Sequence, residues 1–89
     1  MANFDNLVFI DHPSIPDSIM AKHKFDSGKV ISVVAGIGLY SNSKAGVKAA
    51  ATKPEDVTSF EVLVEGEDDV RGWQNRDDIN RIMESYEMY

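Results

Sequence analysis

Cysteine is absent from this sequence of 89 residues. That absence excludes a disulfide framework, a zinc site built on thiolates and a cysteine nucleophile. Long apolar runs are lacking too, since the run near the N-terminus covers only Leu7–Ile10. This run is too short for a signal-peptide core or a membrane span, and no basic region precedes it. We therefore expect a soluble protein that stays in the cytoplasm of the cell that makes it.

Histidine is scarce as well, with only His12 and His23 in the chain. A metal site or a general base would need these residues near each other or near carboxylates. Asp11 precedes His12, but neighbours in an extended loop do not face each other. We expect no catalytic residue and no metal ligand here. A wide hollow lined by either histidine together with several acids would contradict this expectation.

The glycine patterns that bind nucleotides are incomplete. Gly36-Ile-Gly38 follows an apolar segment, but Ser41 stands where a dinucleotide-binding fingerprint needs its third glycine. A phosphate-binding loop fails too, because Ser43 precedes Lys44 where glycine is required. The pattern indicates a strand end or a bulge, and we expect no cofactor.

Charge is distributed unevenly along the chain, which carries a net charge of −6. Residues 1–54 hold six lysines and four aspartates, whereas residues 55–89 hold eleven acidic residues and three arginines. If the two halves occupy different faces, the molecule is dipolar. An acidic face attracts basic protein surfaces and repels the phosphates of nucleic acids. We therefore expect a protein partner with a basic surface, without direct nucleic-acid or membrane binding.

The first half predicts a β-hairpin. Ser18–Phe25 alternates between apolar and lysine-bearing positions, and Lys29–Ala35 is rich in valine and isoleucine. Asp26–Gly28 between them suits a tight turn, so the two strands should pair antiparallel. Before this hairpin, Leu7–Ile10 is a short strand or an arm, and Asp11–Ser18 is a loop with two prolines.

The long connection at residues 41–58 leaves two possibilities open. Ser43 is placed to cap a short helix through Lys44–Ala51, which Pro54 would end. A mobile loop that carries lysines is the alternative.

The second half predicts a third strand and a helix. Ser59–Glu65 alternates, Gly66–Asp69 is a turn, and Val70–Trp73 is a brief fourth strand or a single turn. Asn75 is a good N-cap for the final helix. One apolar stripe on that helix comprises Ile79, Ile82, Met83, Tyr86 and Tyr89, and the residues expected to face water are Arg76, Asn80, Arg81, Glu84 and Glu87.

These elements indicate the fold class. An apolar stripe on a helix must be buried, and the apolar face of the sheet is its available partner. The sequence therefore predicts an α+β fold, in which a three- to four-stranded antiparallel sheet packs one face against a C-terminal amphipathic helix. A chain of this length should form one domain over residues 1–89.

The candidate binding residues lie in the acidic half. Glu65, Glu67, Asp68 and Asp69 lie around one turn, which we name the acidic turn. This turn does not match a calcium loop, so it is either a solvated turn or a patch that docks on a basic protein. Trp73 either closes the core between sheet and helix or serves as an exposed anchor for a partner. The candidate partner-binding residues are Glu65, Glu67, Asp68, Asp69, Trp73, Asp77 and Asp78.

Several segments resemble short proteins of bacteriophages and prophages. They are the hairpin KFDSGKVISVVAG with the later Tyr40, the strand SFEVLV, and the ending DDVRGWQNRDDINRIM. The resemblance covers residues 24–40 and 59–83, and it departs at residues 41–58, where that type has a shorter, glycine-rich link. It implies a viral source and a sheet-plus-helix fold, and it brings no catalytic residue.

Two hypotheses of function follow. The first is a small acidic accessory protein of the phage type that binds a host or viral protein, as an inhibitor of a host enzyme or defence complex. The alternative is a structural module that assembles with itself as a homodimer, because the edges of a small sheet can pair between chains.

Overall fold

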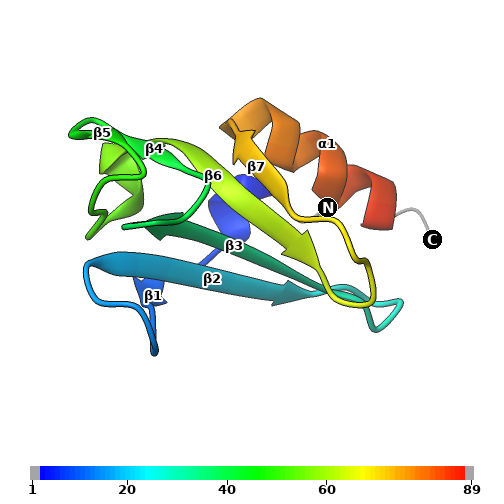
Figure 1. Ribbon diagram of the computed structural model, residues 1–89. Helices are drawn as coiled ribbons and strands as arrows, with labels where there is room; N and C mark the ends of the chain where they lie inside the picture. Colours follow the sequence, from blue (N-terminus) through cyan, green and yellow to red (C-terminus); the bar gives the residue numbers. More distant parts are fainter. Residues whose placement is uncertain (1–2, 88–89) are drawn as a thin grey trace.

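The computed structural model describes residues 3–87 and has an α+β architecture, which confirms the predicted class. The described residues form a seven-stranded antiparallel sheet and one α-helix (Figure 1). The prediction of three to four strands was too low, because three strands are only two residues long and carry no periodic pattern. The elements are η1 Phe4–Asn6, β1 Ile10–Asp11, β2 Ser18–Lys24, β3 Val30–Gly36, β4 Asn42–Ser43, β5 Gly46–Val47, η2 Pro54–Asp56, β6 Val57–Val64, β7 Arg71–Gln74 and α1 Arg76–Glu87, where η denotes a 3-10 helix.

The predicted hairpin is confirmed. β2 and β3 pair antiparallel from Ser18 opposite Gly36 to Lys24 opposite Val30. Gly28 closes the turn with φ 94°, a conformation that glycine adopts without steric cost. β6 then pairs with β3, and it also pairs with β4 and β7. The two halves of the chain are thus interleaved in one sheet and do not form two separate faces.

Of the two alternatives for residues 41–58, the short helix over Lys44–Ala51 is wrong. Residues 42–47 form the small β4–β5 hairpin instead. Ser43 Oγ does accept a local hydrogen bond, from Ala45 N–H at 3.1 Å, but in a turn and not as a helix cap. Gly46 and Lys48 have φ of 138° and 54°, which an α-helix cannot contain. Pairing with β6 therefore decides this segment against the helix propensity of its alanines.

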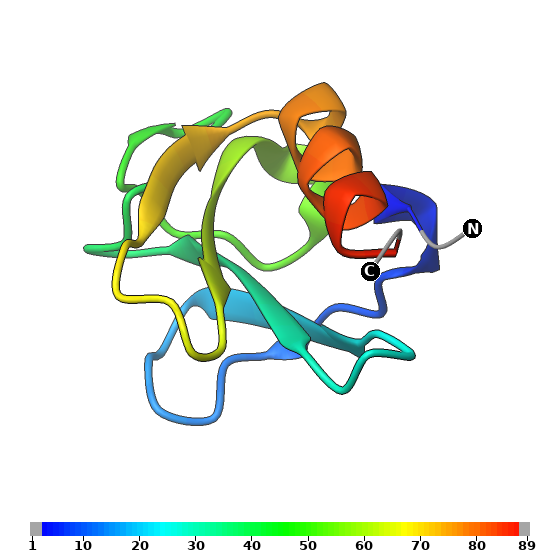
Figure 2. The same ribbon diagram turned by 90° about the vertical axis from the view of Figure 1, so that its right-hand side faces the viewer.

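The core lies between one face of the sheet and α1. Phe60, Val62 and Val64 of β6 are buried, as their alternation predicted. The helix stripe is buried over Ile79, Ile82, Met83 and Tyr86, whereas Tyr89 lies outside the described residues. Figure 2 shows α1 beside η1 on the same side of the sheet, and the Phe4 and Phe60 rings pack with centroids 5.2 Å apart.

Arg76 was expected to face water, but it is partly buried. Its guanidinium donates to the carbonyl oxygens of Pro54 at 2.8 Å and Val57 at 3.1 Å. It also lies over the Phe4 and Phe60 rings, 5.0 and 5.5 Å from their centroids. The start of α1 is thus tied to η2 and to the core.

Asn80 was also expected to face water, but it is partly buried and ties α1 to the N-terminal segment. Its Oδ1 accepts a hydrogen bond from Phe4 N–H at 2.8 Å. The contact explains why η1 stays against the helix. Within residues 3–87, no helix has the length and apolar character needed to cross a membrane.

Candidate functional site

The acidic turn joins β6 to β7. Glu65, Asp68 and Asp69 are exposed, and within residues 3–87 their carboxylates make no hydrogen bond or ion pair. Glu67 is partly buried and pairs with Arg71 at 3.6 Å. An ion pair this close to solvent contributes little to stability. Most of this turn is therefore available to a partner.

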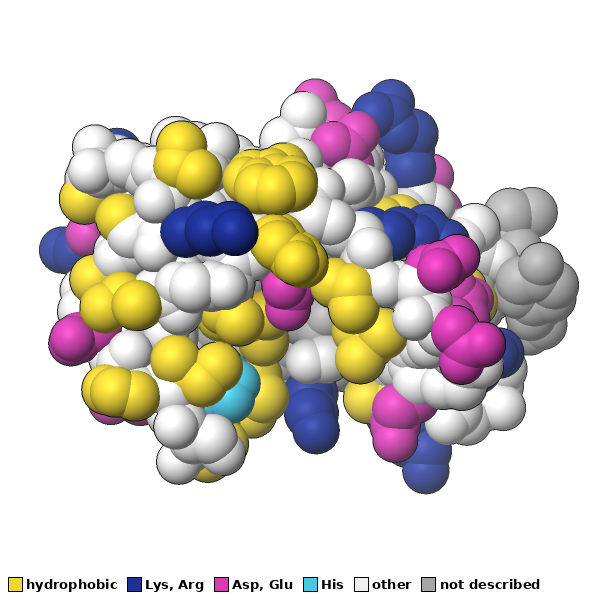
Figure 3. All heavy atoms as spheres, viewed as in Figure 1, with side chains coloured by type: hydrophobic (Ala, Val, Ile, Leu, Met, Phe, Trp, Pro, Cys, Tyr) yellow, Lys and Arg dark blue, Asp and Glu magenta, His cyan; other side chains and the backbone are white. Residues whose placement is uncertain are grey.

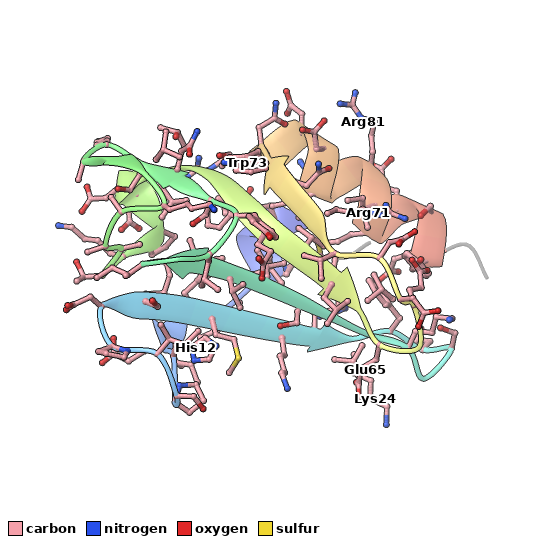
Figure 4. The ribbon with its side chains drawn as sticks, in the orientation of Figure 1. His12, Lys24, Glu65, Arg71, Trp73 and Arg81 are labelled. Carbon is pink, nitrogen blue, oxygen red and sulfur yellow. The ribbon has the colours of Figure 1, made fainter. Side chains whose placement is uncertain are left out.

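Lysines of the first half lie beside this acidic turn. Figure 4 places Glu65 and Lys24 together at one end of the sheet. Lys29 is close as well, since a Cβ built at Gly66 would lie 3.9 Å from its Nζ. Positive and negative side chains are thus mixed at this end, and the expected separation of charge does not form there.

The first turn of α1 uses one of its two aspartates for capping. Asn75 Oδ1 accepts from Asp78 N–H at 2.8 Å, and Asp78 Oδ2 accepts from Asn75 N–H at 3.0 Å, which confirms Asn75 as the N-cap. Arg81 donates to Asp78 Oδ1 at 2.8 Å. The backbone hydrogen bond from Asn75, followed by the bond from Arg81, holds the pKa of Asp78 below its usual value of 3.8. Asp77 is exposed and free of such contacts within residues 3–87.

Trp73 is 47% exposed, so it does not close the core. A β-bulge places it there. Phe60 pairs with Gln74 and Val62 pairs with Arg71, so that Gly72 and Trp73 together oppose one residue of β6. Trp73 has φ 53°, a left-handed conformation that is rare for a bulky residue.

The exposed indole is held in place by its neighbours. Trp73 Nε1–H donates to Asn42 Oδ1 at 3.1 Å, and Trp73 N–H donates to the carbonyl oxygen of Tyr40 at 2.9 Å. The Tyr40 ring packs against the indole with centroids 5.3 Å apart and is itself 46% exposed. Two half-exposed aromatic side chains therefore form one fixed surface.

Tyr40 is positioned by three further contacts. Its N–H donates to Glu61 Oε1 at 3.2 Å, on the outward face of β6. Lys48 Nζ lies 4.8 Å from its ring centroid, within the range of a cation–π interaction. Its Cβ lies so close to Gly72 that a Cβ at position 72 would approach it to 2.8 Å. Glycine is the residue that permits this approach.

We name the surface made by Tyr40, Val47, Lys48 and Trp73 the aromatic face. Val47 is 69% exposed and pairs with Asn42, the residue that accepts the indole hydrogen bond. Figure 3 shows hydrophobic side chains gathered in a band across the view of Figure 1, with acidic side chains beside it. The sequence singled out Trp73 as a candidate anchor, but no local pattern links Tyr40, Val47 or Lys48 to it.

The predicted acidic residues and Trp73 do not converge on one point. Glu65 follows the end of β6, and Figure 4 places it far along the sheet from Trp73. At about 3.3 Å per residue, the four steps from Glu61, which lies opposite the bulge, to Glu65 span about 13 Å. The acidic residues flank the aromatic face and do not surround it.

His12 lines a hollow of about 290 Å³ together with Asp11 and Asp17. A hollow lined by a histidine together with acidic residues bears against the expectation that the chain has no catalytic residue and no metal ligand. However, His12 Nδ1 accepts hydrogen bonds from Ser14 N–H at 3.1 Å and Ile15 N–H at 3.2 Å, so that nitrogen is not available as a base. Among residues 3–87, no group of three or more His, Cys, Asp and Glu side chains is placed to hold a metal ion.

His23 lies away from that hollow, on the buried side of β2. Its Nε2 is 3.9 Å from Glu87 Oε1, and its ring meets Phe25 edge-on with centroids 4.9 Å apart. It therefore packs at the end of the core.

Comparisons of this chain with family models, curated proteins and solved structures find no match.

Proposed function

We propose that this protein is a non-catalytic binding module that docks on another protein through the aromatic face. One observation supports this most directly: Trp73 and Tyr40 are both about half exposed yet fixed by hydrogen bonds and ring contact. Trp and Tyr dominate the residues whose loss costs most binding energy in protein interfaces. Because the two rings are held before binding, little side-chain entropy is lost on docking.

The backbone at Trp73 supports the same proposal. A left-handed conformation for a bulky residue costs about 1–3 kcal/mol, and such strain is concentrated at functional sites. Gly72 and the bulge direct this side chain outward. An exposed tryptophan at this position adds little to the core, which supports a role for its side chain in binding a partner.

Charge indicates the type of partner. Asp68, Asp69 and Asp77 are exposed near the two ends of β7, and none has an ion pair within residues 3–87. A partner with an apolar centre and a basic rim would fit the aromatic face and these carboxylates together. We propose a host or viral protein in the bacterial cytoplasm, which the module blocks sterically; the phage-type resemblance of residues 24–40 and 59–83 supports this setting.

The test is a capture experiment with matched variants. Wild type, Trp73→Ala, Tyr40→Ala and Val8→Ala are immobilised and exposed to bacterial lysate at low and high salt. Val8 is 76% exposed and lies outside the aromatic face, so its variant controls for the general loss of apolar surface. Circular dichroism confirms that each variant is folded.

The proposal requires one protein that wild type and Val8→Ala capture and that both aromatic variants lose. Capture of nothing at either salt concentration would count against a binding module. Capture that survives both aromatic substitutions would place the interface elsewhere. Light scattering of the purified protein over a hundredfold dilution tests whether it forms a homodimer in place of a complex with a separate partner.

A further inference from the structure

The hollow beside His12 is a built feature separate from the aromatic face. It has a volume of about 290 Å³ and lies where the loop before β2 meets the segment after β5. Figure 4 labels His12 in this region. The lining residues are Asp11, His12, Ile15, Pro16, Asp17, Ser18, Ala51 and Thr52.

Backbone hydrogen bonds fix the walls of the hollow. His12 N–H donates to Ser18 O at 2.8 Å, which closes the loop, and Ala51 N–H donates to Asp17 O at 2.9 Å, which joins the second segment to it. The two hydrogen bonds that His12 Nδ1 accepts orient the imidazole and leave Nε2–H as its free polar group. The hollow is therefore present before a ligand arrives.

The chemistry of the lining selects a cation on an apolar stem. Asp11 and Asp17 contribute carboxylates that make no hydrogen bond or ion pair within residues 3–87, and no lysine or arginine is part of the lining. Ile15, Pro16 and Ala51 supply apolar walls against which methylene groups can pack. Two carboxylates and apolar side chains in one lining suit a guanidinium on an aliphatic stem, because its N–H groups donate to carboxylate oxygens while the stem packs on apolar groups.

Size limits the ligand further. Sites for drug-sized ligands begin at about 300 Å³ and extend to about 1,000 Å³. A hollow of about 290 Å³ is large enough for one side-chain-sized group. We propose that this hollow binds a guanidinium group on an aliphatic stem, either as the arginine side chain of a protein or as a free small molecule.

The experiment is a titration followed through the backbone amide signals in NMR spectra. The probes are Nα-acetyl-arginine amide, agmatine, and Nα-acetyl-norleucine amide, which keeps an aliphatic stem and lacks the charge. We expect saturable shifts at residues 12–18 and 51–52 with the two guanidinium probes only. Tighter binding of Nα-acetyl-arginine amide than of agmatine assigns the site to protein side chains, and the reverse order assigns it to free cations.

Variants locate the site. Asp11→Asn and Asp17→Asn should each weaken guanidinium binding roughly tenfold, because each removes a charged acceptor. Asparagine tolerates the left-handed backbone of Asp17, whose φ is 54°. Asp26→Asn, in the exposed β2–β3 turn, is the matched control and should bind as wild type.

Three results would overturn the assignment: no saturable shift, equal binding of the norleucine probe, or wild-type affinity in both lining variants. None of these measurements uses the partner that the aromatic face is proposed to bind. The hollow can therefore fail its test while the aromatic face passes, and the reverse also holds.

Discussion

At the scale of single residues, the aromatic face depends on a glycine, Gly72, which has no side chain. Gly72 lets the Tyr40 ring approach the indole of Trp73, which is the sole tryptophan of the chain. The bulge and the left-handed backbone of Trp73 complete the arrangement. Gly72, the bulge and the left-handed backbone lie close together in space, but Tyr40 and Trp73 are far apart in sequence.

The first prediction concerns Gly72→Ala. The new Cβ would approach Tyr40 Cβ to 2.8 Å, so Tyr40 must move away from the indole. Quenching of Trp73 fluorescence by acrylamide should therefore rise, and the captured partner should bind more weakly. Tyr40→Phe keeps the ring and should quench as wild type. Unchanged quenching in Gly72→Ala would show that the contact does not depend on this glycine.

The second prediction concerns pH and Asp78. Its pKa is lowered in the folded state because Asn75 and Arg81 stabilise the carboxylate. Its contribution to stability is therefore present above the unfolded value of 3.8 and is lost as the pH falls through the folded pKa. Asp78→Asn should lower stability at neutral pH and make the acid loss shallower, as urea unfolding at several pH values would measure.

Asp77→Asn is the control for this effect, since Asp77 is the exposed neighbour without these hydrogen bonds. It should change stability less at neutral pH. If both variants respond alike, the charge of the helix terminus and not the cap would account for the pH dependence.

At the scale of elements, Arg76 holds the start of α1 against η2 and the core. Its two hydrogen bonds reach Pro54 and Val57, and its guanidinium covers the Phe4 and Phe60 rings. The apolar stripe of α1 determines which face of this helix is buried. The arginine also ties the start of the helix to η2 and to the first residue of β6.

The third prediction follows from these contacts. Arg76→Ala should destabilise the fold by about 2–3 kcal/mol, because hydrogen bonds from a charged donor contribute about 1.5–3 kcal/mol. Arg76→Lys should recover only part of this loss, since an ammonium cannot reproduce the planar, two-ended geometry. Urea unfolding measures both. Glu84→Ala, at an exposed position of α1, should change the free energy of unfolding by less than about 0.5 kcal/mol. An effect that small for Arg76→Ala would show that the Arg76 contacts do not hold the start of the helix.

At the scale of the whole molecule, β2 leaves part of the sheet edge open. β1 pairs only with Ile19 and Met20, so residues 21–24 of β2 have no strand partner on that side among the described residues. Lys22 and Lys24 are exposed on this stretch. Lysines on an edge strand oppose pairing between copies, because two such edges would bring like charges together.

The fourth prediction tests whether the lysines on the β2 edge oppose pairing between copies. A double variant, Lys22→Thr and Lys24→Thr, should raise the average mass in light scattering as concentration increases. The control is the double variant Lys44→Thr and Lys53→Thr, which makes the same change of net charge at exposed positions outside β2. Its average mass should not rise with concentration. Equal behaviour of the two double variants would show that total charge, and not the β2 edge, controls association.

Much of the fold could be predicted from the sequence because its signals are local. The alternation in β2 and β6, the glycine turn between β2 and β3, and the Asn75 cap with its helix stripe all depend on residues a few positions apart. The same local rules failed at residues 44–51, where alanines favoured a helix and pairing with β6 decided otherwise.

The candidate sites were decided by the tertiary structure. Trp73 could be singled out from composition, but its exposure depends on a bulge against β6 and on the distant Tyr40 and Asn42. The hollow likewise needs Ala51 to meet Asp17 across the fold. Local periodicity determines which side of each element is buried, whereas surfaces and hollows arise where distant segments meet, and contacts of that range leave no pattern in the sequence.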